Sequence, residues 1–225
     1  MRRGILATRD ELRALKHKLA RGPFNAIYDR LQKRCSLILE SAPVTEQQWR
    51  AAWARGRWGA AAQAARVAQG RIWDLLIAHH VDPNPAFRDR AIEELKELTR
   101  WASWVDPASS PLPADLCTAE AGAAAVVALD WLWEDLVEAD RLRVLQALRH
   151  KVVEPYMKAV ENKAWWYGCY HNWNAVVNGG CGMAGLALGD EEPLAAEAAT
   201  AAQSGLRPFF NALGREGGWD EGTGY

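Results

Sequence analysis

Hydrophobic and polar positions along the chain repeat with the period of an α-helix. Between Pro85 and Trp104, the apolar residues Ile92, Leu95 and Leu98 fall near one stripe of a helix, and charged residues fill positions between them. Alternation of β-branched residues, which is typical of strands, does not extend beyond four positions anywhere in the chain. The pattern therefore predicts an all-α protein.

Short breaks divide the helical pattern into about eight segments. We expect helices over residues 8–20, 23–39, 45–78, 85–104, 115–133, 138–160 and 172–188, and a last one that ends near residue 213. Gly56, Gly59 and Gly70 are candidate breaks in the third segment, and Pro155 is a candidate break in the sixth. Connections this short place consecutive helices antiparallel, so residues 1–225 are predicted to be one domain of helical hairpins. Such hairpins form a bundle, a solenoid or a closed toroid, and the absence of a fixed repeat period argues against tetratricopeptide or armadillo arrays.

The composition narrows the possible classes of function. Hydrophobic residues make up 49% of the 225 positions, which is enough for a large core, and the net charge of -1 gives no electrostatic basis for nucleic-acid binding. There is no run of about 18 apolar residues, so we expect no membrane span. The apolar stretch from Gly4 to Ala7 is too short for a signal peptide. The four cysteines match no common zinc spacing, and we predict no metal and no cofactor.

Tryptophan is unusually frequent in this chain. There are 12 tryptophans, against 4 phenylalanines and 5 tyrosines. An indole offers a flat apolar face together with an N–H donor, and this combination suits proteins that bind sugars, although many of these side chains are expected in the core.

A cluster of aromatic and amide side chains lies between residues 165 and 180. Five aromatic residues fall within nine positions: Trp165, Trp166, Tyr167, Tyr170 and Trp173. On a helix, His171, Asn174 and Asn178 share one face, where they can donate hydrogen bonds to an anionic or hydroxyl-rich ligand. In the alternative interpretation, Asn172 caps the helix and the other two asparagines satisfy buried backbone groups. The polar stripe beside an aromatic wall favours a ligand site.

A second polar segment runs from Gly214 to Tyr225. Five of its twelve residues are glycines, so it is predicted to be a loop that places side chains in a pocket rather than a helix. Asp220, Glu221 and Tyr225 are titratable residues near its end. A free terminal tail is the alternative, but Trp219 argues against it, because an exposed tryptophan is unusual in such a tail.

Three blocks of sequence follow one another in a characteristic order. They are Asp115–Leu136 with its runs DLCTAE and DWLWEDL, Asn172–Gly180 with the run NWNAVVNGG, and Gly217–Tyr225 with the run GGWDEGTGY. Together they resemble the heparinase II/III-like polysaccharide lyases and their alginate-lyase relatives. The resemblance covers roughly residues 100–225, and the first hundred residues match only in helical character. The chain departs from the family pattern at Leu129 in place of Tyr, Glu216 in place of Asp, and Asn174 where many members have His.

The resemblance implies an incomplete (α/α) toroid and a polysaccharide lyase that cleaves a uronic-acid polymer by β-elimination. A base removes the proton next to the sugar carboxylate, an acid protonates the departing glycosidic oxygen, and neighbouring groups stabilise the developing charge. Carried over by position, Tyr225 would transfer a proton, while Asn172 and Asn174 would hold the carboxylate. Because Asn174 stands where many members have His, the nearest imidazole, His171, would take over the second proton transfer. The residues expected to bind substrate are Trp165, Trp166, Tyr170, Trp173, Asn178, Trp219 and Glu221.

Members of this family continue into further toroid helices and a β-sandwich domain. We therefore expect the chain to be part of a larger enzyme, and expect it alone to be inactive or to form a homodimer through exposed apolar surface. The partner that the resemblance implies is an anionic polysaccharide or oligosaccharide.

Two other functions stay open at this point. One is a glycoside hydrolase on an (α/α) toroid with Asp220 and Glu221 as catalytic carboxylates, although adjacent residues point in different directions and are poorly placed as an acid–base pair. The other is a non-catalytic helical domain that binds sugars or serves as a scaffold.

Overall fold

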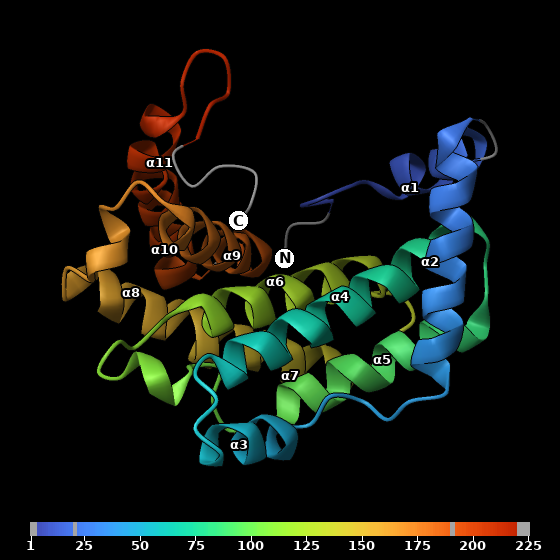
Figure 1. The fold of residues 1–225 in the computed structure, drawn as a ribbon, viewed down its shortest axis with the longest axis horizontal. Helices are drawn as coiled ribbons and strands as arrows, with labels where there is room; N and C mark the ends of the chain where they lie inside the picture. Colours follow the sequence, from blue (N-terminus) through green and yellow to red (C-terminus); the bar gives the residue numbers. More distant parts are fainter. Residues whose placement is uncertain (1–3, 20–21, 190–191, 220–225) are drawn as a thin grey trace.

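The computed structural model describes residues 4–19, 22–189 and 192–219 (Figure 1). Within these ranges every regular element is a helix and there is no strand, so the predicted all-α class is confirmed. None of the helices described is both long and apolar enough to cross a lipid bilayer.

The helices follow one another with short connections. They are α1 (Arg9–Leu19), α2 (Pro23–Leu39), α3 (Glu46–Ala54), α4 (Ala60–Val81), α5 (Pro85–Arg100), α6 (Leu116–Trp131), α7 (Glu138–Leu148), α8 (Glu154–Glu161), α9 (Asn172–Leu188), α10 (Pro193–Gly205) and α11 (Arg207–Ala212). Three shorter helical turns complete the path: η1 (Pro107–Ser109), η2 (Arg149–Val153) and η3 (Trp165–Tyr167).

The structure interrupts two of the predicted segments at or near residues that the sequence marks as candidate breaks. The helix predicted over residues 45–78 is two helices, α3 and α4, because the chain turns at Gly56 and Gly59, whose φ angles of 75° and 70° are left-handed. The segment predicted over residues 138–160 contains a π-helical turn, η2, just before Pro155. Proline lacks the N–H that would continue the α-helical ladder, which fits an irregular turn at this position.

Helices α4, α6 and α9 lie side by side in the middle of the molecule (Figure 1). Contacts between α4 and α6 advance in the same direction along both helices, from Arg66 with Glu120 to His80 with Trp131, so these two helices are parallel. After α4, helix α5 runs in the opposite direction and leads the chain back to the start of α6. The α7–α8 segment does the same between the end of α6 and the start of α9. The chain is thus a succession of antiparallel helix pairs.

Small side chains set the spacing around α6 and α9. Every residue of α6 after Leu116 is buried, so this helix is covered on all sides. A Cβ atom on Gly180 of α9 would overlap the backbone carbonyl of Ala119 in α6, and one on Gly185 would overlap the carbonyl of Ala195 in α10. These glycines are therefore required where two helix backbones approach closely.

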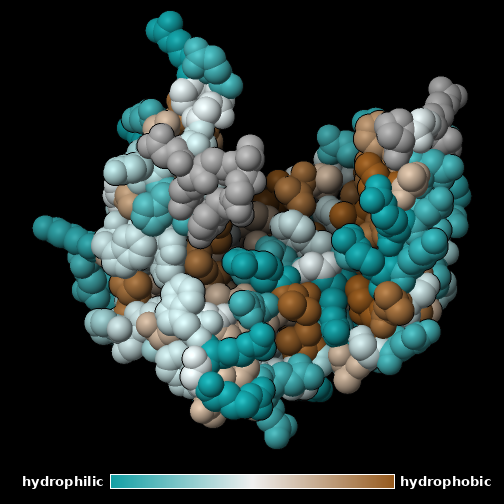
Figure 2. Space-filling view, in the orientation of Figure 1, coloured by the Kyte–Doolittle hydropathy of each residue, from teal (hydrophilic) through white to brown (hydrophobic). Residues whose placement is uncertain are grey.

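The two ends of the chain form raised edges on either side of a hollow. In Figure 2, the surface sinks between the edge made by α1 and α2 and the edge made by α10 and α11, and hydrophobic residues are visible inside the hollow. The described helices form an open arrangement rather than a closed ring.

Candidate functional site

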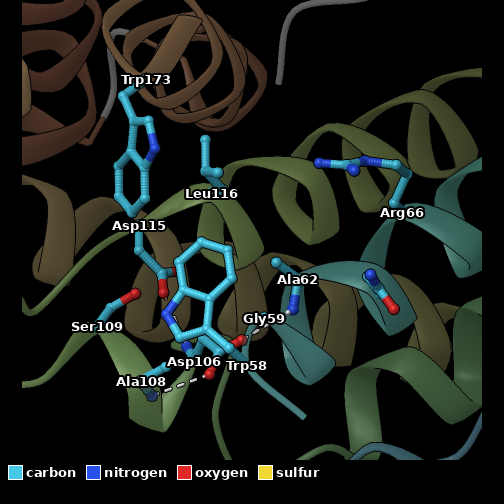
Figure 3. A pocket seen from close by; sticks show the side chains of 11 residues that line it. Trp58, Gly59, Ala62, Arg66, Asp106, Ala108, Ser109, Asp115, Leu116 and Trp173 are labelled. Atoms are coloured by element: carbon cyan, nitrogen blue, oxygen red, sulfur yellow. Dashed lines mark hydrogen bonds between the residues drawn. The ribbon is translucent and has the colours of Figure 1, made fainter. Parts of the chain in front are cut away.

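The N-terminal ends of α4, α6 and α9 surround an open cavity of about 160 Å³ (Figure 3). Four segments of the chain line it: Trp58, Gly59, Ala62, Gln63 and Arg66 at the start of α4, Asp106, Ala108 and Ser109 around η1, Asp115 and Leu116 at the start of α6, and Trp173 in α9. The N-terminal end of a helix carries partial positive charge. Three such ends contribute partial positive charge to the cavity, and at the starts of α4 and α6 it is offset by the carboxylates of Asp106 and Asp115, which also line the cavity.

Two aspartates connect the segments that form the floor of the cavity. Asp115 precedes α6 and accepts a hydrogen bond from the backbone N–H of Thr118 (3.1 Å), as an N-cap residue does. Its other carboxylate oxygen accepts a hydrogen bond from the N–H of Asp106 (2.9 Å). The side chain of Asp106 accepts hydrogen bonds from the N–H groups of Ala61 (3.1 Å) and Ala62 (3.3 Å) in the first turn of α4. These bonds join the starts of α4, η1 and α6.

The hydrogen bonds of Asp106 and Asp115 indicate a positioning role rather than a catalytic one. Both side chains are buried, and their oxygens accept hydrogen bonds from backbone N–H groups of the cavity floor. Burial raises the pKa of Asp115 above its ordinary value, and this effect is larger than the opposing effect of its hydrogen bonds. Neither carboxylate is arranged as one member of a free acid–base pair.

An ion pair between α4 and α6 forms another part of the site. Both Nε and Nη2 of Arg66 donate to the same oxygen of Glu120, Oε1, at 3.0 and 2.6 Å. The Glu120 side chain is only 8% exposed, whereas the Arg66 side chain is 60% exposed and lines the cavity. Burial raises the pKa of Glu120 above its ordinary value, and the pairing with Arg66 opposes this only in part.

Aromatic rings stand at the α9 side of the cavity and at its entrance. Trp173 lines the cavity, and the centroid of its ring lies 5.0 Å from that of Trp165. The Trp165 ring is in turn 5.5 Å from the imidazole of His171. Trp58, in the loop before α4, keeps 74% of its surface exposed. Figure 3 shows the two cavity indoles, Trp58 and Trp173, on one side and Arg66 on the other.

The predicted polar stripe on α9 is not a surface feature. Asn174 and Asn178 are completely buried. The amide of Asn174 donates to the carbonyls of Trp166 (3.2 Å), Tyr167 (2.8 Å) and Gly205 (2.8 Å). The amide nitrogen of Asn178 donates to the carbonyl of Asn174 (2.8 Å). These asparagines satisfy buried backbone groups, as the alternative interpretation held, and are shielded from any ligand in this structure.

Two further aromatic residues of the predicted set do not line the cavity. Trp166 is fully buried, and its ring stacks on that of Tyr156 with 5.9 Å between the centroids. The hydroxyl of Tyr156 donates to Oδ1 of Asn178 (2.7 Å), so these three side chains belong to one buried cluster. Tyr170 is exposed but lies outside the cavity lining.

His171 occupies the N-cap position of α9, so the part of the alternative interpretation that made Asn172 the cap is wrong. The φ of His171 is -112° and its ψ is -177°, an extended conformation. Helical spacing therefore does not apply to His171, which explains why it separates from the two buried asparagines. Its Nδ1 lies 3.3 Å from Oδ1 of Asn172, the first residue of the helix. Both side chains are half-buried beside the aromatic cluster.

The glycine-rich segment after α11 is described only as far as Trp219. Up to that point it is a loop, and the Trp219 ring packs edge-on against Phe209 with 5.6 Å between centroids. Trp219 is thus held by the protein and half-buried. Asp220, Glu221 and Tyr225 lie outside the described residues.

The remaining reactive groups of the described chain offer no second site. All four cysteines are free, and burial raises the pKa of Cys35 to about 12 and the pKa values of Cys117 and Cys181 well above their ordinary value. Within the described residues, no group of three or more His, Cys, Asp or Glu side chains is arranged to hold a metal ion.

Several cavity residues were missed in the sequence because they are far apart along the chain. Trp58 and Arg66 precede Trp173 by more than a hundred positions, and no local spacing links them. The capping pattern from Asp115 to Thr118 was recognisable, but only as a helix start. In comparisons with known proteins, no family model matches the chain, and no curated protein matches it.

Proposed function

We propose that the cavity binds an anionic saccharide and that the chain is the helical part of a polysaccharide lyase, an incomplete (α/α) toroid that acts on a uronic-acid polymer by β-elimination. One observation carries the proposal: the exposed indole of Trp58, the half-buried indole of Trp173 and the exposed guanidinium of Arg66 share one open cavity at the N-terminal ends of three helices. The resemblance of the three sequence blocks to polysaccharide lyases supports the reaction class.

The indoles supply a surface that fits a sugar ring. A pyranose has apolar C–H faces, and an indole can cover such a face while its N–H donates a hydrogen bond. Trp58 and Trp173 both line the cavity, and Trp165 extends the aromatic surface beyond it. We propose that these three rings contact successive parts of a saccharide chain.

The exposed guanidinium of Arg66 is the feature of the cavity that favours an anionic sugar over a neutral one. The negative charges of Asp106 and Asp115 are directed at backbone N–H groups, whereas Arg66 exposes its charge to the cavity. The helix ends add partial positive charge. In β-elimination, these groups would stabilise the negative charge that develops on the uronate carboxylate when its neighbouring proton is removed.

His171 is the described residue best placed for proton transfer. Its imidazole contacts the Trp165 ring at the α9 side of the cavity, and a histidine can accept or donate a proton near neutral pH. The second proton-transfer group in the proposal is Tyr225, and Asn172 would orient the carboxylate. Asn174, being buried and bonded to three carbonyls, is left out of the proposed contacts.

Binding of defined oligosaccharides tests the proposal. The probes are tetramers of β-1,4-linked mannuronate and of α-1,4-linked galacturonate, titrated by calorimetry. We expect Trp173→Ala to weaken binding by about tenfold, or roughly 1.4 kcal/mol, because it removes an aromatic face of the cavity. Trp53→Ala, at an exposed tryptophan of α3 that does not line the cavity, is the control and should bind like wild type.

Analysis of the products separates the three candidate functions. Elimination forms a C=C bond that absorbs near the ultraviolet edge, and hydrolysis forms new reducing ends without that absorbance. Binding without either product would indicate a non-catalytic module, or the inactive state that we expect of the chain by itself, and repeating the assay with a longer natural form would decide between them. Failure of both uronate tetramers to bind would overturn the proposal.

A further inference from the structure

The Arg66–Glu120 pair leaves part of the guanidinium available to a ligand. A guanidinium has two edges that can each donate two parallel hydrogen bonds. Glu120 occupies the edge formed by Nε and Nη2, with both nitrogens donating to a single oxygen. Nη1 makes no hydrogen bond with the described residues, and Nη2, which donates one hydrogen to Glu120, carries a second one. The edge formed by Nη1 and Nη2 can therefore still donate two hydrogen bonds to a ligand, and the side chain is 60% exposed.

Glu120 holds the guanidinium in place from the protein side. It lies on α6, its side chain is 8% exposed, and its second oxygen, Oε2, is buried without a hydrogen-bond partner. If the pair with Arg66 broke, the buried carboxylate of Glu120 would have no hydrogen-bond partner on either oxygen. Breaking the pair therefore carries a large free-energy cost. The pair therefore restricts the orientation of Arg66 on the wall of the cavity.

No other basic side chain lines the cavity among the residues that the structure describes. The neighbouring carboxylates of Asp106 and Asp115 accept hydrogen bonds from backbone N–H groups, and Asp115 also accepts one from the Thr118 hydroxyl. Among the described residues, neither carboxylate is hydrogen-bonded to Arg66. An anionic group that enters the cavity therefore meets one directed, multivalent donor. A planar carboxylate matches the free guanidinium edge better than a hydroxyl does.

We propose that Arg66 is the specificity-determining residue of the cavity: it binds the carboxylate of a uronate residue, and Glu120 is the positioning residue that orients it. This inference rests on the proposed saccharide-binding function and adds the residue that distinguishes charged from neutral sugars. It assigns the two indoles to ring contact and Arg66 to charge recognition.

A matched pair of ligands tests this division. Tetramannuronate and β-1,4-mannotetraose differ at C6, which is a carboxylate in one and a hydroxymethyl group in the other. We expect wild type to prefer tetramannuronate, and Arg66→Gln to weaken that ligand by about 10- to 100-fold while leaving mannotetraose unchanged. Arg66→Lys should restore only part of the preference, because an ammonium lacks the planar edge.

The control and the positioning variant sharpen the result. Arg34→Gln removes another exposed arginine, 63% exposed and paired with Asp74 at 2.7 Å on a different surface, and should change neither affinity. Glu120→Gln should reduce the preference for tetramannuronate several-fold without changing mannotetraose binding, an effect that general loss of structure would not produce.

The outcomes separate this inference from the function on which it rests. If wild type prefers tetramannuronate but Arg66→Gln keeps that preference, the assignment of Arg66 is overturned and the proposed function stands. Equal weakening of both ligands would reduce Arg66 to a structural role and also overturn the assignment. If wild type binds neither uronate nor neutral tetramers, both proposals fail.

Discussion

The interface of α9 with η3, α8 and α10, and the cavity at the N-terminal ends of α4, α6 and α9, use polar and aromatic residues in opposite ways. At the interface, Asn174, Asn178 and Trp166 are buried, and the asparagines are bonded to backbone carbonyls or to Tyr156. At the cavity, Trp58 and Arg66 keep most of their side-chain surface exposed. Residues of similar chemistry thus serve stability in one region and are available to a ligand in the other.

The comparison teaches that burial decides the role of a polar residue more directly than its type. An asparagine whose amide satisfies three carbonyls in the interior cannot also contact a substrate, and losing it leaves those carbonyls unpaired. An arginine anchored along one edge in a cavity wall retains donors for a ligand. Substitutions at the interface should therefore change the free energy of unfolding, whereas substitutions at the cavity should change ligand binding.

The largest effect is expected at the closest helix contact. Gly180→Ala places a methyl group against the carbonyl of Ala119, so the helices must separate, and we expect the free energy of unfolding to fall by about 3 kcal/mol. Gly179→Ala is the matched control, since a Cβ there meets no atom within 4 Å. It should raise stability by about 0.5–1 kcal/mol through helix propensity. Equal responses in urea unfolding would contradict the close contact.

A smaller loss is expected when the buried amide network is broken. Asn178→Ala removes the acceptor of the Tyr156 hydroxyl and the donor to the carbonyl of Asn174, and should cost about 2–3 kcal/mol in chemical unfolding. Tyr156→Phe removes only the hydroxyl and should cost about 1–2 kcal/mol. A double variant that costs less than the sum of the two would confirm that the groups are coupled.

The ion pair at the cavity predicts that the difference in free energy of unfolding between wild type and Glu120→Gln depends on pH. The pKa of Glu120 is raised in the folded protein, mainly by burial, so the fold holds its proton more tightly than the unfolded chain does. Ionisation therefore costs stability as the pH rises from the ordinary glutamate pKa through the raised one. Relative to Glu120→Gln, wild type should gain stability as the pH falls through this window. Urea unfolding of both proteins between about pH 4 and 7 measures it, and a difference of the opposite slope would refute the burial argument.

The smallest effect on stability is expected at the entrance of the cavity. Trp58 is 74% exposed, so Trp58→Ala should change the free energy of unfolding by less than about 0.5 kcal/mol. The same variant should weaken binding of tetramannuronate, because Trp58 lines the cavity. A large loss of stability would show that the indole packs as part of the core and would remove the contrast between the two regions.

The sequence by itself determined the all-α class and most helix positions. Helical periodicity indicates which residues of one segment face inward. It can be recognised within that segment alone, without knowing which other helices pack against it. Breaks at proline and at the Asp115 capping pattern were local signals of the same kind. The sequence marked Gly56, Gly59 and Gly70 alike as candidate breaks, because glycine is free to adopt left-handed or helical angles. Only the structure shows that Gly56 and Gly59 interrupt the helix and that Gly70 does not.

Only the tertiary structure decided which polar residues reach a ligand. Sequence spacing grouped His171 with Asn174 and Asn178, but the extended conformation of His171 at the start of α9 places it outside the helical register. The buried amides are satisfied by carbonyls of η3 and Gly205, partners that no periodicity identifies. The cavity itself is lined by residues from 58–66, 106–116 and 173. These residues meet because α4, α6 and α9 begin on the same side of the molecule. Helix periodicity contains no information about that alignment, since it is set by packing between helices that are distant along the chain.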